Sequence, residues 1–161
     1  MEWTRSMMVL FPLVLVAAAP PARSKSDEQI LFELVNLERK KENLPTLRLN
    51  PLLTRAARLH AENMARQEKM NHILDGKGVG DRVTAMGYEF RIVGENLAMS
   101  AIEGTRDAPP ESPYEIHENW MGSPGHRANI LHPKYREIGL HRCHSKKGTF
   151  FYVQVFAAHL D

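Results

Sequence analysis

The chain has 161 residues, of which 43% are hydrophobic and 25% charged, and its formal net charge at pH 7 is +2. This length and composition predict one soluble globular domain with enough apolar residues for a sizeable core. Charges of one sign form no long runs and basic residues do not alternate with aromatic ones, so we expect no nucleic-acid partner.

The N-terminus is predicted to be a secretory signal peptide over residues 1–18, followed by a linker over residues 19–26. Arg5 precedes an almost wholly apolar run over residues 7–19, and small residues follow, which is the order typical of such peptides. The apolar run is short for a membrane span. We therefore expect a secreted, periplasmic or extracellular protein with no stable membrane span after cleavage. An uncleaved anchor is the alternative.

Cys143 is the only cysteine, so no internal disulfide can form. A secreted domain without disulfides is held by its core, which this length permits, and this favours a bacterial protein. We expect Cys143 to be a half-buried thiol on a strand. The alternatives are a nucleophile and an intermolecular bridge.

Two helices are predicted in the first half of the chain. Ser26 and Gln29 resemble a capping box, and a helical apolar face then extends to about residue 43, with residues 38–42 as solvated charge. That face consists of Ile30, Leu31, Leu34, Val35 and Leu37. A second helix begins at Asn50-Pro51 and ends near Lys69. It places His60 on its apolar face, where a hydrogen-bonded packing role is favoured over metal binding.

Shorter elements are predicted beyond the second helix. Residues 81–86 form a short helix that Gly87 caps, and residues 88–93 form an extended approach to residues 94–98. Residues 104–113 form a Pro-rich polar loop, expected to be mobile. Two helices follow, from Ser112-Pro113 to Met121 and from Pro124 to Leu131, with Ser123 as N-cap of the second.

Two strands close the chain, over residues 138–141 and 150–157, joined by a turn at residues 145–148. Phe151 and Val153 fall on one face of the last strand, and Tyr152 and Phe156 on the other. Aromatic residues on both faces predict a central strand that helices cover on each side. The expected fold is α+β, a three-layer α-β-α sandwich with a small central antiparallel sheet.

Three familiar catalytic signatures are incomplete or missing. His117-Glu118 begins like a zincin helix, but Met121 stands where the second histidine is needed. The chain has no Gly-rich phosphate loop and no Gly-x-Ser-x-Gly elbow. The remaining candidates are His72, Glu95 and His126, each predicted in or beside a helix end or loop. Two imidazoles and a carboxylate can bind a divalent metal, or the carboxylate can orient one ring.

The chain resembles the CAP superfamily of cysteine-rich secretory, antigen 5 and pathogenesis-related proteins, also called the SCP domain, and its bacterial secreted branch in particular. The resemblance covers residues 27–158 and predicts a CAP domain over residues 27–161. It rests on residues 36–39, 56–65, 71–72, 81–83, 87–88, 94–98, 120–131, 138–139 and 152–156.

The resemblance implies a central cleft that holds two His and two Glu, in which the His pair can bind zinc. The first His matches His72, the first Glu matches Glu95 and the second His matches His126. The second Glu is replaced by Ser123, so four residues become three and tight metal binding is disfavoured.

Two functions follow as expectations. The first is a monomeric binding or scaffold module that takes a lipid, peptide or glycan in the cleft. Zn2+ would then bind weakly and optionally to His72 and His126, with Glu95 as a further ligand or as the group that orients an imidazole. The alternative is an extracellular, peptidase-like hydrolase in which His126 or a metal-bound water is the base. Ser123 could be its nucleophile, although a role as helix N-cap is favoured. We favour a binding module over an enzyme.

Overall fold

The structure is a computed structural model that describes residue 1, residues 24–100 and residues 111–160. The predicted signal peptide and most of the predicted loop at residues 104–113 lie outside the described residues, and both stay predictions. Within the described ranges, no helix combines the length and the apolar character that a bilayer span requires.

A four-stranded sheet forms the middle layer, with strand order β1-β3-β4-β2. The strands are β1 (Arg48–Leu49), β2 (Phe90–Ser100), β3 (Glu137–His144) and β4 (Phe150–His159). Strands β2, β4 and β3 pair antiparallel, as predicted, and β3 and β4 form the predicted hairpin. The two-residue β1 pairs parallel to β3, so the sheet is mixed rather than purely antiparallel.

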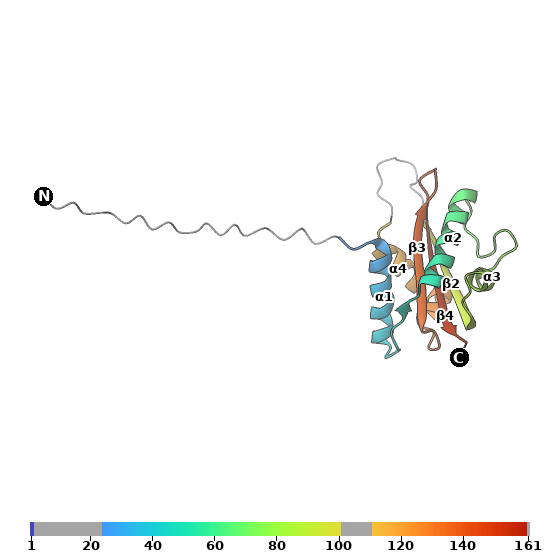
Figure 1. Cartoon of the computed structure of the whole chain (residues 1–161), viewed down its shortest axis with the longest axis horizontal. Coiled ribbons are helices and arrows are strands. Elements are labelled where there is room, and N and C mark those ends of the chain that lie inside the picture. Colours follow the sequence, from blue (N-terminus) through green and yellow to red (C-terminus); the bar gives the residue numbers. More distant parts are fainter. Residues whose placement is uncertain (2–23, 101–110, 161) are drawn as a thin grey trace.

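Helices cover both faces of this sheet, as Figure 1 shows. They are α1 (Asp27–Lys41), α2 (Pro51–Gln67), α3 (Val79–Ala85), α4 (Pro113–Gly122) and α5 (Pro124–Ile130). Helices α2 and α3 lie on one face, and α1, α4 and α5 lie on the other. The predicted three-layer α-β-α sandwich is confirmed.

Strand β4 is central, and its two faces belong to two separate cores. Phe151, Val153 and Val155 pack with the apolar residues of α2, whereas Tyr152 and Phe156 pack with those of α1 and α4. All five are fully or almost fully buried. The alternation of the strand therefore divides its side chains between the two layers of helices, as predicted.

The predicted helix starts are present, with one difference at Ser123. Ser26 forms its capping box with Gln29, and Asn50 accepts from the backbone of the first turn of α2. Ser123 occupies the N-cap position of α5, but its side chain makes no capping hydrogen bond. The predicted N-cap position of Ser123 is nevertheless confirmed, and Pro124 follows it as the first helical residue, as predicted.

Arg39 contradicts the prediction that residues 38–42 are all solvated charge. Its side chain is fully buried, and it donates to the carbonyl oxygens of Pro45 at 2.8 Å, Ile130 at 2.8 Å, His132 at 3.0 Å and Tyr135 at 3.2 Å. The guanidinium thus joins the end of α1 to the end of α5 and the segment after it. The four carbonyls compensate for its desolvation.

Candidate functional site

Glu95 lies in the middle of β2, not in or beside a loop as the sequence suggested. It pairs with Val155 across the sheet, so its side chain points to the face that α2 covers. The carboxylate is buried, with 2% of the side chain exposed. An ionised carboxylate at such a position needs hydrogen-bonding or cationic partners.

Three side chains supply those partners. Arg82 Nη2 lies 2.6 Å from one carboxylate oxygen, and His72 Nδ1 lies 2.9 Å from the other. His60 Nε2 approaches the same oxygen as His72, at 3.9 Å. The predicted pairing of Glu95 with His72 is therefore present, within a larger cluster that also includes Arg82 and His60.

Arg82, in α3, fixes this cluster to the loop before it. Its Nη1 donates to the backbone oxygen of His72 at 3.1 Å and to that of Lys77 at 2.8 Å. One guanidinium therefore holds both the carboxylate and the backbone of the histidine that the carboxylate orients. The sequence alone does not predict this role of Arg82, because no local pattern around α3 indicates a contact with β2.

His72 lies in the irregular segment after α2, and 56% of its side chain is exposed. A carboxylate can only accept at this distance, so Nδ1 carries the proton and donates to Glu95. The other ring nitrogen, Nε2, is left available to a ligand. A carboxylate that fixes the tautomer and the orientation of an imidazole in this way is common around metal-binding histidines.

Asn96 points to the opposite face of β2 and holds α5 against the sheet. Its Nδ2 donates to the backbone oxygen of His126 at 3.1 Å and to Gln154 Oε1 at 3.2 Å. Asn129 Nδ2 donates to the backbone oxygen of Glu95 at 3.2 Å and to Asn96 Oδ1 at 2.9 Å. Asn96 and Asn129 thus satisfy backbone oxygens, and Gln154 has a buried hydrogen-bond partner.

His126 is a half-buried residue in the first turn of α5. Burial lowers the pKa of this imidazole, and the charge of His72 lowers the pKa further. His72 is thus near enough for its charge to affect the pKa of His126. A lowered pKa keeps the His126 ring neutral, which is the form that binds metal.

The described residues do not form a closed metal site. Among the described residues, no group of three or more His, Cys, Asp or Glu side chains could hold a metal ion. Both carboxylate oxygens of Glu95 are already engaged, by Arg82 and His72. A structural zinc site, which has four protein ligands, is therefore not formed by the described residues.

The serine nucleophile considered from the sequence has no geometric support. No hydrogen bond joins Ser123 to His126 in the described part of the chain, and an activated serine needs a base within such reach. Cys143, in β3, is a half-buried free thiol, as predicted. Burial raises its pKa, which disfavours the reactive thiolate.

The three-layer sandwich, together with His72 hydrogen-bonded to Glu95 of its outer strand β2, is characteristic of a CAP-like domain. The model of the cysteine-rich secretory protein family matches residues 32–156, and the chain belongs to this family. The resemblance noted from the sequence is confirmed.

Bacterial relatives match most of this chain. It is 30% identical over 121 residues to the uncharacterised protein YkwD of Bacillus subtilis, covering 74% of this chain and 44% of YkwD. It is 29% identical over 119 residues to the uncharacterised membrane protein YlbC of the same organism, covering 73% of this chain and 32% of YlbC. The chain thus spans less than half the length of either relative.

Solved structures share the fold. An outer surface protein of Borrelia burgdorferi has a TM-score of 0.74 at 24% identity, over 86% of this chain and 97% of that one. An extracellular SCP-domain protein of Bacillus anthracis has a TM-score of 0.67 at 26% identity, over 81% of this chain and 40% of that one. NaASP2 with Zn2+ has a TM-score of 0.56 at 14% identity, over 86% of this chain and 83% of that one.

Proposed function

We propose that this protein is a secreted binding module in which His72, Glu95 and His126 form the functional site. In this proposal the site takes a lipid, peptide or glycan, and the protein acts as a monomer. The observation that carries the proposal is the 2.9 Å hydrogen bond from His72 Nδ1 to a buried carboxylate. A solvent-exposed imidazole held in one tautomer by such a carboxylate is prepared to bind a ligand or a metal through Nε2.

Weak binding of Zn2+ by His72 and His126 is part of this proposal. Glu95 would orient His72 without reaching the metal, since Arg82 occupies its second oxygen. Bound Zn2+ would act as a Lewis acid or hold a ligand group. Support comes from the charge interaction between the two imidazoles. A CAP relative solved with Zn2+ gives additional support.

Secretion is proposed from the predicted signal peptide together with the relatives. The Borrelia burgdorferi relative is an outer surface protein, and the Bacillus anthracis relative is extracellular. Expression of the full chain in a bacterial host should release a protein whose N-terminus, read by mass spectrometry, follows residue 18. Retention of residues 1–18 on a membrane-bound product would contradict secretion and support the anchor.

Calorimetric titration with Zn2+ tests the site. We expect the wild-type protein to bind one Zn2+ weakly, and the His72→Ala and His126→Ala variants to lose this binding. His144→Ala is the matched control, because His144 is an exposed histidine at the far end of β3 and should leave zinc binding unchanged. Equal zinc uptake by the wild-type protein and the His72→Ala variant would refute the proposed metal site.

A further inference from the structure

A basic cavity lies at the end of the sheet where β1, β2 and β3 begin and β4 ends, opposite the turn that joins β3 to β4 (Figure 1). Its volume is about 410 Å3, within the range of small-molecule sites. All four strands contribute to its lining, together with Lys134 and Arg136 in the segment before β3. His72, Glu95 and His126 are not among the lining residues, so the cavity is separate from the site proposed above.

Positive charge dominates the lining of this cavity. Arg48, Lys134 and Arg136 are exposed residues, and Glu137 is the only carboxylate among the described lining residues. The three cations leave a formal excess of two positive charges over that carboxylate. Arg91, which already has an interaction partner, adds a further cationic side chain. The cavity therefore has the charge that an anionic ligand requires.

Glu137 is held by another residue and neutralises little of this charge. Its Oε2 accepts from the hydroxyl of Tyr88 at 2.5 Å, and 15% of its side chain is exposed. Burial and this hydrogen bond raise the pKa of Tyr88, so the hydroxyl keeps its proton and stays a donor. Arg48 Nη2 lies 3.8 Å from the other carboxylate oxygen, and such an exposed ion pair contributes little. Lys134 and Arg136 are thus left without a counter-charge in the described part of the chain.

Arg136 presents a preformed pair of donors. Its Nη1 donates to the backbone oxygens of Pro133 at 2.7 Å and Tyr135 at 2.9 Å, which fixes the guanidinium. Its Nε and Nη2 make no hydrogen bond with any described residue. These two nitrogens form one edge of the planar guanidinium, and such an edge binds phosphate through two parallel hydrogen bonds. Because the side chain is oriented before a ligand arrives, less entropy is lost on binding.

The buried Arg39 lies close behind Arg136. Arg39 Nη2 donates at 3.2 Å to the same Tyr135 oxygen that Arg136 contacts. Burial lowers the pKa of Arg39, and the charge of Arg136 lowers it further. Two like charges that converge on one carbonyl oxygen repel each other, so an anion bound to Arg136 would offset this repulsion.

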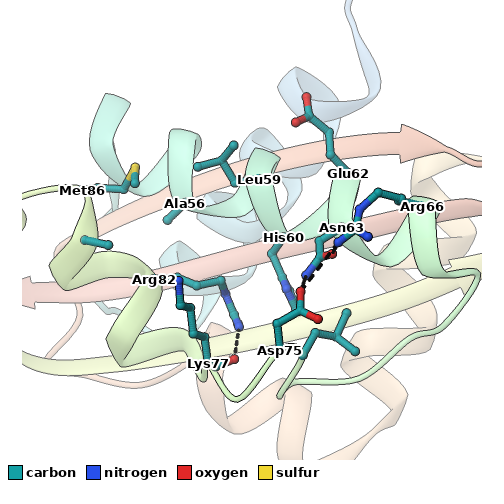
Figure 2. A pocket seen from close by; sticks show the side chains of 12 residues that line it. Ala56, Leu59, His60, Glu62, Asn63, Arg66, Asp75, Lys77, Arg82 and Met86 are labelled. Carbon is teal, nitrogen blue, oxygen red and sulfur yellow. Dashed lines mark hydrogen bonds and ion pairs between the residues drawn. The ribbon is translucent and has the colours of Figure 1, made fainter.

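The cavity between α2 and α3 differs in its charges. It is larger, about 510 Å3, and its arginines already have carboxylate partners (Figure 2). Arg66 Nη2 lies 3.6 Å from Asp75, and Arg82 Nη2 lies 2.6 Å from Glu95. Unpaired positive charge is therefore a property of the cavity at the end of the sheet and not a general property of the cavities in this protein.

From this charge and geometry we infer that the cavity at the end of the sheet is a binding site for a compact ligand that carries a diphosphate group. The Nε–Nη2 edge of Arg136 would bind two oxygens of one phosphate group, and Arg48 and Lys134 would supply positive charge to the second. Ile92 and Ala158, which are paired across β2 and β4, also line the cavity and offer carbon surface to an organic group attached to the diphosphate.

The shape of the site favours a soluble ligand over a membrane of anionic lipid. A cavity surrounds a small molecule on several sides, whereas a flat bilayer contacts only the side chains that project furthest. Free pyrophosphate and organic diphosphate esters share the chemistry that the site recognises. The inference goes beyond the site proposed at His72, and it does not depend on zinc.

Isothermal titration calorimetry of the zinc-free protein tests this inference. The probes are pyrophosphate, inorganic phosphate, and uridine diphosphate as a diphosphate ester. We expect at least one diphosphate to bind with a millimolar or lower Kd, and more tightly than inorganic phosphate. Tighter binding of uridine diphosphate identifies an ester as the source and tighter binding of pyrophosphate identifies the free anion, and both outcomes support the site. No binding of either diphosphate, equal affinity for inorganic phosphate, or binding only to vesicles of phosphatidylglycerol would overturn it.

Three variants locate the binding. Lys134→Ala removes an exposed cation of the cavity and should weaken diphosphate binding about threefold. Lys146→Ala is the matched control, because it removes the same charge from the turn at the opposite end of the sheet and should leave binding unchanged. Glu137→Gln keeps an acceptor for Tyr88 but removes the negative charge, so it should tighten binding about threefold.

The variants also distinguish a specific site from general attraction between charges. Equal weakening by the two lysine variants, or unchanged affinity in the Glu137→Gln variant, would mean that the diphosphate binds elsewhere and would overturn the inference. Zinc titration of the Lys134→Ala variant should match the wild-type protein, so this site and the proposed metal site can fail separately.

Discussion

Glu95 and Asn96 are consecutive residues of β2 whose side chains hold opposite layers of the sandwich. Glu95 binds Arg82 and His72 on the face that α2 and α3 cover, while Asn96 binds the backbone oxygen of His126 on the face that α5 covers. The alternation of a strand sends adjacent side chains to opposite faces. One dipeptide therefore fixes both histidine-bearing segments relative to the sheet.

Replacement of Glu95 by Gln should destabilise the protein through this cluster. The substitution leaves Arg82, of whose side chain only 11% is exposed, without its counter-charge, and it weakens the hold on His72. We expect a loss of about 3 kcal/mol in the free energy of unfolding, measured by urea denaturation. Glu42→Gln is the control, because Glu42 and its partner Arg127 are about half exposed, and a change below about 0.5 kcal/mol is expected there. Similar losses in the two variants would contradict a structural role of the cluster.

The electrostatic link between the two site histidines can be measured directly. Since the charge of His72 lowers the pKa of His126, the His72→Ala substitution should raise the pKa of His126. Burial is the larger cause of the lowering, so the pKa should stay below its ordinary value of about 6.5 even in the variant. NMR titration of the His126 ring signals measures both values. An unchanged midpoint in the variant would mean that the rings are too far apart to share a ligand.

The sequence predicts the sandwich well because its periodicities are strong. The capping residues Ser26 and Asn50 predict where the first two helices begin, and both starts are confirmed. The alternation of residues 150–157 predicts the last strand, which is also confirmed. The sequence places Glu95 in or beside a loop because its small and turn-forming neighbours, Gly94 and Asn96, have low strand propensity. Packing on both faces and pairing with β4 outweigh that propensity. Contacts between distant segments, such as Arg82 with Glu95, leave no local signal in the chain.

Arg39 shows the same limitation, and its importance can be tested. In sequence it belongs to a run of charged residues, yet four carbonyl oxygens surround its fully buried guanidinium. Arg39→Lys keeps the charge but cannot reproduce this fork of donors, so we expect a loss of about 3 kcal/mol in the free energy of unfolding. Arg58→Lys, at a position with 52% of the side chain exposed, should cost less than about 0.5 kcal/mol. A fully stable Arg39→Lys protein would show that lysine can replace these contacts.

Gly139 lies where α2 packs closely against the sheet. A Cβ atom at this position of β3 would overlap the carbonyl carbon of Leu53 and the backbone nitrogen of Thr54. Both are backbone atoms of α2, which cannot move without disturbing the core. We expect Gly139→Ala to cost more than about 3 kcal/mol or to prevent folding, as measured by circular dichroism during thermal unfolding. Gly125→Ala is the control and should be neutral, because a Cβ there would meet nothing within 4 Å beyond its own chain neighbours and helix backbone. A neutral Gly139→Ala would contradict the close approach.

His117 should make the contact between α1 and α4 sensitive to acid. Only 5% of His117 is exposed, and neither ring nitrogen has a hydrogen-bond partner in the described part of the chain. Burial lowers the pKa of His117. The charge of Lys41 also lowers this pKa, whereas the charges of Glu38 and Glu118 raise it. The folded protein therefore binds a proton at this ring less readily than the unfolded chain does.

This lowered pKa fixes the sign of the pH dependence. The contribution of His117 to stability is fully present above the ordinary histidine pKa of about 6.5, and it is lost as the pH falls below that value, because the unfolded chain then takes up a proton. Replacement of His117 by Leu removes the titrating group while keeping a similar volume. Between pH 7.5 and pH 5.5 the wild-type protein should lose about 1 kcal/mol more of its free energy of unfolding than the His117→Leu variant does. Urea denaturation at both pH values measures this difference, and equal losses would mean that His117 is protonated equally easily in the folded and unfolded protein.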